Sequence, residues 1–131
     1  LADALQELAE RTHAAHAGVR VEVHTELGDA LLGTEAALTL YRAAQEGVTN
    51  ALRHGQATVL RLSVQSTPRG LQLELQDNGR GLIDAQASER DGHYGLRWLR
   101  ERVQALGGSL SIGNRSEGGV LLQVMLPRPP A

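Results

Sequence analysis

The stretch EGVTNALRHG, residues 46–55, ends a segment of helical periodicity with a line of polar side chains. Glu46, Asn50 and either Arg53 or His54 recur every three or four residues, so they share one face of a helix. The run stops at Gly55, a residue typical of helix ends. Taken alone, the pattern favours the solvent-exposed face of an amphipathic helix over a ligand-binding face.

The sequence around this stretch alternates between helical and strand patterns. Thr34 can cap a helix that begins at residue 35. Helices are predicted at 2–14, from 35 to about 53, and at 96–106. Strands are predicted from alternating apolar and polar residues at 18–27, 57–67, 71–76, 109–115 and 120–126. Short Pro- and Gly-containing turns join the last four strands into two hairpins, which predicts antiparallel strand pairs with the helices on one side. This is a two-layer α+β sandwich.

The spacing of apolar residues predicts which helix faces are buried. In the helix that begins at residue 35, the expected core positions are Leu38, Tyr41, Val48 and Leu52. In the helix at 96–106 they are Leu96, Leu99, Val103 and Leu106. No internal repeat, linker or second domain is visible, so residues 1–131 are predicted to form one domain with a tail at 127–131.

Composition excludes several kinds of site. The chain has 13 basic and 15 acidic residues and a net charge of −2, which argues against a nucleic-acid binder held by bulk electrostatics. It has no cysteine, so disulfides and thiolate metal sites are excluded. No apolar run approaches the ~20 residues of a membrane helix. Since the first residue is Leu1, we expect a fragment of a longer chain.

A second motif, LELQDNGRGL at residues 73–82, places an acid directly after a strand. Asp77 is followed by Gly79 and Gly81, which permit positive φ and the close approach of a ligand. A carboxylate only accepts hydrogen bonds, so it can receive the exocyclic amine of adenine, whereas guanine presents a carbonyl there. An ordinary Asp-Asn-Gly turn explains the same residues equally well.

A third motif, DGHYGLRWL at residues 91–99, brackets His93 and Tyr94 with Gly92 and Gly95 just before a helix. Free N–H groups and the helix dipole favour an anion at such a place. A loop that merely precedes a helix is the alternative. Two other phosphate-binding motifs do not match the residues present. A Walker-type loop needs a lysine, which this chain lacks, and a dinucleotide fingerprint needs glycine where Asp84 stands.

The three motifs gain specificity from their order. From about residue 20 to residue 127, the chain resembles the ATP-binding fold of the GHKL superfamily, which unites gyrase-type topoisomerases, mismatch-repair ATPases, a chaperone and sensor histidine kinases. It is most similar to the catalytic domains of sensor histidine kinases of the nitrate-sensor type. The resemblance implies a Bergerat-type sandwich in which about three helices cover one face of a mixed sheet of about five strands.

The resemblance also implies roles for individual residues. Glu46 would be the catalytic base, and Asn50 would bind Mg²⁺ and ATP. Asp77 would read adenine. The other implied ATP-binding residues are Arg53, His54, Gly79, Gly81, Gly92, His93, Tyr94, Gly95 and Leu96. The stretch from about residue 83 to 91 would be the lid over the nucleotide.

Two departures from the family pattern stand out. Val120 occupies a position where the family usually has threonine, which puts the strength of adenine binding in question. The family's phosphoacceptor histidine is also missing, because His13 lacks the acidic neighbour of that motif. We therefore expect His13 to have a surface or structural role.

The function implied by the resemblance is transfer of the γ-phosphoryl group of ATP·Mg²⁺ to a histidine of a separate dimerisation domain, and then to a response regulator. The parent would be a homodimeric cytoplasmic kinase that can be anchored in a membrane, and the isolated domain would be monomeric and inactive alone. An anti-sigma-type serine kinase and a non-catalytic nucleotide sensor of the same fold are the alternatives.

Overall fold

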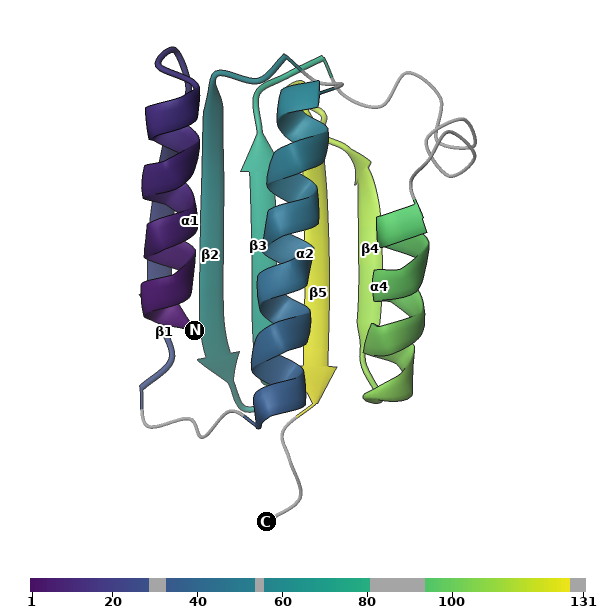
Figure 1. The fold of residues 1–131 in the computed structure, drawn as a ribbon. Helices are drawn as coiled ribbons and strands as arrows, with labels where there is room; N and C mark the ends of the chain where they lie inside the picture. The colour runs from purple at the N-terminus through teal and green to yellow at the C-terminus, as the bar shows by residue number, and fades with distance from the viewer. Residues whose placement is uncertain (29–32, 54–55, 81–93, 128–131) are drawn as a thin grey trace.

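The computed structural model describes residues 1–28, 33–53, 56–80 and 94–127, which form three helices and five strands (Figure 1). In chain order the elements are α1 (Ala2–Ala15), β1 (Arg20–Glu26), α2 (Thr34–Arg53), β2 (Val59–Thr67), β3 (Gly70–Asp77), α4 (Tyr94–Ala105), β4 (Ser109–Asn114) and β5 (Val120–Pro127). All three helices lie on the same face of the sheet, with α1 at one side and α4 at the other. The predicted two-layer α+β sandwich is confirmed.

The sheet is mixed, with strand order β1-β2-β3-β5-β4. The two predicted hairpins, β2–β3 and β4–β5, are antiparallel, as is the central pair β3–β5. The first strand, which the hairpin prediction did not cover, is different: β1 runs parallel to β2 with Arg20 opposite Val59. The reason is the connection: α2 crosses over between the two strands, and such a crossover returns the chain in the same direction. The mixed sheet implied by the resemblance is therefore the one found.

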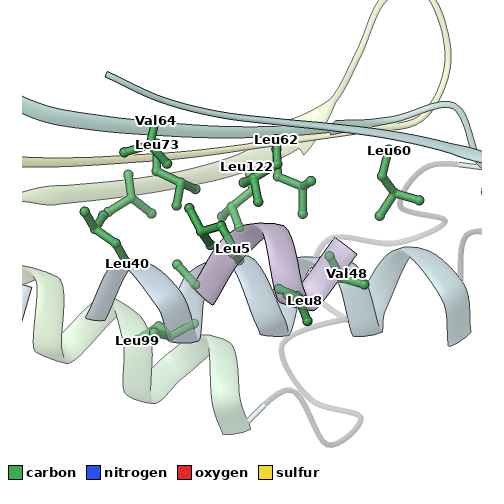
Figure 2. Packing of buried hydrophobic residues seen from close by; sticks show 14 of the residues in the cluster. Leu5, Leu8, Leu40, Val48, Leu60, Leu62, Val64, Leu73, Leu99 and Leu122 are labelled. Carbon is green, nitrogen blue, oxygen red and sulfur yellow. The ribbon is translucent and has the colours of Figure 1, made fainter. Parts of the chain in front are cut away.

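The core fills the space between the helices and one face of the sheet. Figure 2 shows Leu60, Leu62 and Leu122 of the sheet meeting helix side chains such as Leu40 and Leu99. Each of these five side chains is at most 2% exposed. On the opposite face, β2 and β3 carry polar residues that bond to one another, as Gln65 does to Gln72. The alternating sequence pattern therefore corresponds to one buried and one polar face.

One predicted core position of α2 is wrong. Leu38 is 49% exposed, whereas Val48 is buried and Tyr41 and Leu52 are partly buried against the core. The buried face of α2 is made mainly of small side chains, namely Thr39, Leu40, Ala43, Ala44, Val48 and Ala51. Leu38 lies nearly half a turn from the middle of that face, because each residue advances a helix by about 100°. The side chains on the buried face of α2 are therefore smaller than those that the sequence pattern predicted.

Gly47 brings α2 unusually close to the sheet. A Cβ at this position would lie 2.3 Å from Leu75 Cδ2 and 3.1 Å from Leu122 Cδ2, on β3 and β5. Any larger residue would have to push these side chains aside or lift the helix. Since Gly47 lies between Glu46 and Asn50, its contact with the sheet sets the height at which that polar stripe sits above β3.

The C-terminal boundary differs slightly from the prediction. Pro127 is the last residue of β5 and lies opposite Gly70 in the ladder with β3. A proline is tolerated at such a place because it is at the end of the strand. The remainder of the predicted tail, residues 128–131, lies outside the described residues.

Candidate functional site

Three of the predicted motifs meet at one end of the molecule. The C-terminal end of α2, the end of β3 and the turn between β4 and β5 lie at the top in Figure 1, and α4 begins lower down, with its first turn directed toward the same end. Helices α2 and α4 run antiparallel and are joined at their other end by an ion pair between Glu35 and Arg102. The sequence motifs thus come together around the end of the central strand β3.

Asp77 is the most constrained polar residue at this end. Its side chain points to the helix-covered face of β3, and the residue is only 5% exposed. One carboxylate oxygen, Oδ1, accepts the backbone N–H of Gly79 at 2.8 Å and that of Val120 at 3.3 Å. Since a buried carboxylate is costly unless it is hydrogen-bonded, these two amides offset part of the cost of burial and fix the direction of the carboxylate. The Asp-Asn-Gly turn and the ligand-reading acid, weighed as alternatives above, are compatible in this geometry.

The turn between β4 and β5 closes over Asp77. Gly119 has φ +88°, and a Cβ there would lie 1.9 Å from the Asp77 carbonyl oxygen. Arg115 donates from Nη1 to that same oxygen at 2.9 Å. Neither Gly119 nor Arg115 was identified from the sequence. The adjacent glycines in 115-RSEGG-119 indicate a positive-φ turn, but nothing local indicates contact with a residue 38 positions away.

Asn78 has a structural role that the sequence analysis also missed. Its Oδ1 accepts the backbone N–H groups of Thr58 and Val59, both at 2.9 Å, and its Nδ2 donates to Thr58 Oγ1 at 2.9 Å. Its own N–H donates to the Val59 carbonyl at 3.2 Å. Asn78 therefore fastens the end of β3 to the beginning of β2, which holds the neighbouring Asp77 in place.

The polar stripe of α2 is partly accessible. Glu46 and Asn50 are half-buried and Arg53 is exposed. To the other residues that the structure describes, these three side chains make no hydrogen bond or ion pair. Half-buried polar groups without a protein partner are available to a ligand. The stripe lies on the side of α2 that faces α4, the side from which Glu35 reaches Arg102. His54 lies outside the described residues.

The first turn of α4 supplies backbone donors that no carbonyl of the helix accepts. The helix begins at Tyr94, so the N–H groups of Tyr94, Gly95 and Leu96 have no partner within the helix. The Leu96 side chain is 3% exposed and belongs to the core, so only its backbone can reach an anion. Gly79 lies next to Asp77 and binds its carboxylate. Gly81, Gly92, His93 and the predicted lid lie outside the described residues.

The side-chain oxygens on α2 suit a metal ion that is bound partly by the protein and partly by a ligand. Among the residues that the structure describes, no cluster of three or more His, Cys, Asp or Glu side chains could hold a metal ion alone. Asn50 offers one amide oxygen and Glu46 one carboxylate a turn earlier on α2. Magnesium is characteristically bound by one or two protein oxygens and completes its octahedron with phosphate oxygens and water. The residues present therefore fit Mg²⁺ that arrives with a nucleotide.

Comparison with known proteins assigns the fold to a family. Residues 35–130, which span α2 to β5, match the family described as "Histidine kinase-, DNA gyrase B-, and HSP90-like ATPase". The chain belongs to this family. The family predicted from the order of the three motifs is thereby confirmed, and an ATPase family implies ATP binding.

Individual relatives point to sensor kinases. The chain is 32% identical over 107 residues to the nitrate/nitrite sensor protein NarX of Escherichia coli, covering 82% of this chain and 18% of NarX. It is 30% identical over 113 residues to the histidine-protein kinase/phosphatase DegS of Bacillus subtilis, covering 82% of this chain and 29% of DegS. The chain thus spans less than a third of the length of these relatives.

A solved structure extends the likeness to the whole chain. The ATP-binding domain of PrrB from Mycobacterium tuberculosis superposes with a TM-score of 0.75 and 25% identity, covering 98% of this chain and 94% of that domain. The match includes α1 and β1, which precede the residues matched by the family. None of the helices in the described residues is long and apolar enough to cross a membrane.

His13 lies away from the site. It is near the end of α1, which packs on β1 at the opposite side of the molecule from α4 (Figure 1). Its Nδ1 donates to the carbonyl oxygen of Val19 at 2.9 Å, since a carbonyl can only accept. This bond ties the end of α1 to the beginning of β1 and supports the structural role expected for His13.

Proposed function

We propose that this chain is the ATP-binding catalytic domain of a sensor histidine kinase. It binds ATP with Mg²⁺ and donates the γ-phosphoryl group to a histidine on the dimerisation domain of the same protein. The phosphoryl group then passes to an aspartate of a response regulator. The observation that carries the proposal is the buried Asp77 carboxylate, fixed by two backbone amides at the end of β3 where α2 and α4 also converge.

Asp77 would determine the choice of nucleotide. Its carboxylate accepts the exocyclic amine of adenine, and the same position in guanine carries a carbonyl that the carboxylate repels. Because one oxygen is already held by Gly79 and Val120, the carboxylate is oriented before the nucleotide arrives. Such preorganisation lowers the entropic cost of binding.

The α2 stripe and the first turn of α4 would hold the phosphates between them. Asn50 would bind Mg²⁺ by its amide oxygen, and the metal when bound neutralises charge that develops on the phosphates. Arg53 at the end of the stripe, His54 after it and the free N–H groups of the α4 N-terminus add positive potential. Phosphoryl transfer depends mainly on positioning and charge neutralisation, which these groups supply.

Glu46 would act on the acceptor. The bond between the γ-phosphorus and its bridging oxygen breaks as the nitrogen–phosphorus bond forms, and ADP leaves. The imidazole proton passes to the Glu46 carboxylate, which is half-buried and unpaired among the described residues. A pure nucleotide sensor needs no such base, and the sensor-kinase relatives do not favour a serine kinase of the anti-sigma type.

The remaining parts of the proposal concern the parent protein. Because the phosphoacceptor motif is absent from these residues, the isolated domain would be monomeric and inactive alone, and the parent would be a homodimer. The parent would act in the cytoplasm and could be anchored in a membrane.

Nucleotide binding tests the proposal. Asp77→Asn replaces the acceptor-only carboxylate by an amide whose nitrogen would face the adenine amine. Calorimetry should show loss of ATP binding by at least about a hundredfold, with an unchanged circular-dichroism spectrum. The unaltered chain should prefer ATP to GTP and bind ATP more tightly with Mg²⁺. ATP affinity of Asp77→Asn equal to that of the unaltered chain would remove the adenine-reading role.

A further inference from the structure

The peptide bond that follows Asp77 is held from both sides. Its N–H, on Asn78, donates to the Val59 carbonyl of the chain entering β2. Because a trans peptide points its N–H and C=O in opposite directions, the Asp77 carbonyl faces the β5 side. The ladder between β3 and β5 has ended there, since its last pair is Gln76 with Leu121. Val120, the next residue of β5, stands across from Asp77 and donates its N–H to the Asp77 carboxylate at 3.3 Å.

Arg115 reaches this carbonyl from the turn between β4 and β5. Its Nη1 donates to the Asp77 carbonyl at 2.9 Å, and its side chain is only 21% exposed. Its Nη2 bonds Glu117 at 2.9 Å, but Glu117 is 78% exposed, and exposed ion pairs contribute little. The contact with the Asp77 carbonyl is thus the one expected to matter, because a part-buried hydrogen bond from a charged donor contributes more than an exposed ion pair.

We propose that Arg115 is a positioning residue for adenine recognition. By fixing the carbonyl of Asp77, it fixes the backbone from which the carboxylate projects. This inference rests on the proposed role of Asp77 and adds to it a specificity determinant on the β4–β5 turn. It also explains how Val120 can stand where the family usually has a threonine. The carboxylate is held by the Val120 amide, and its backbone by Arg115, without a side-chain hydroxyl.

The test compares ATP with purine riboside triphosphate, which lacks the 6-amino group. Arg115→Gln shortens the side chain so that it no longer reaches the Asp77 carbonyl. We expect about a five- to tenfold loss of ATP affinity and little change for the analogue, so the preference for ATP falls by the same factor. Arg115→Lys, which keeps a long cationic donor, should restore part of the preference.

Glu117→Gln is the matched control, because it removes the exposed ion pair and leaves the contact with Asp77 intact. It should bind both nucleotides as the unaltered chain does. An unchanged preference in Arg115→Gln, or equal losses for both nucleotides, would overturn the positioning role. If Arg115→Gln does not fold, Arg115→Lys is compared with Glu117→Gln instead. The positioning role then requires that Arg115→Lys prefer ATP over purine riboside triphosphate less strongly than Glu117→Gln does. Retained ATP binding in Asp77→Asn would instead mark failure of the proposed function itself.

Discussion

Gly119 lies against the backbone of Asp77 so closely that no other residue fits. A Cβ at Gly119 would be 1.9 Å from the Asp77 carbonyl oxygen and 2.9 Å from its Oδ1. The β4–β5 turn thus covers the end of β3, and the acid at the centre of the site is held by a segment more than 35 residues further along the chain. The binding of a ligand at Asp77 should depend on this contact as much as on the carboxylate.

Replacing Gly119 by alanine should abolish nucleotide binding. The new Cβ would push the turn away from Asp77 and remove the Val120 amide from the carboxylate. We expect at least about a hundredfold loss of ATP affinity, measured by calorimetry. Gly118→Ala is the matched control, because Gly118 also has a positive φ of 101° but open space around its Cβ position. Both variants carry backbone strain of about 1 kcal/mol or more, so equal ATP affinities would show that the close approach is unimportant.

Gly47→Ala should weaken ATP binding with little effect on stability. Alanine favours the helix by about 1 kcal/mol, and this offsets part of the about 1–3 kcal/mol that overpacking against Leu75 costs. The adjustment raises α2, and with it Glu46 and Asn50, relative to Asp77. If the strain makes the free energy of ATP binding about 1 kcal/mol less favourable, the ATP affinity falls about fivefold. Thermal melting and calorimetry together separate the two effects.

Gly113→Ala on β4 is the control for Gly47→Ala, since its Cβ would meet nothing within 4 Å. It should leave ATP affinity unchanged. If Gly47→Ala also keeps full affinity while its melting temperature rises, then Leu75 has simply moved aside. Gly47 would then have no part in setting the height of the polar stripe.

The elements of this fold were predictable because their patterns are local. The alternation in residues 57–67 and 71–76 and the turn between them predicted the β2–β3 hairpin, since neighbouring strands joined by a short turn can pair in only one direction. The position of Asp77 at the end of β3 followed in the same way. The register of these strands places Asp77 on the buried face, as the alternation requires.

Contacts between distant segments were not predictable from those patterns. The parallel pairing of β1 with β2 depends on the path of α2, and the exposure of Leu38 depends on which face of α2 meets the sheet. Arg115 looks like an ordinary turn residue until β5 is known to lie beside β3. The roles of individual residues at the site stay predictions, and those of His54, Gly81, Gly92 and His93 fall outside the described residues.

Glu46→Gln should separate binding from transfer. Glutamine keeps the size of the side chain and its place on α2 but cannot take a proton from the acceptor imidazole. ATP affinity should stay within about twofold, whereas transfer to an added dimerisation domain of the parent protein should slow by about 10²–10⁴-fold. The measurement is single-turnover transfer of label from γ-labelled ATP. A transfer rate equal to that of the unaltered chain would remove Glu46 from the role of base.

His13 should not accept a phosphoryl group when the chain is incubated alone with γ-labelled ATP. It lies on α1, which packs on β1 at the opposite side of the sheet from α4 and the candidate site, and its Nδ1 bonds the Val19 carbonyl. His13→Ala should instead lower stability by about 1 kcal/mol, a shift in melting temperature of a few degrees, because that bond is lost. His16→Ala, an exposed position just after α1, should melt like the unaltered chain. A lasting phosphoryl label on His13 that acid removes would contradict both the structural role and the need for a separate acceptor domain.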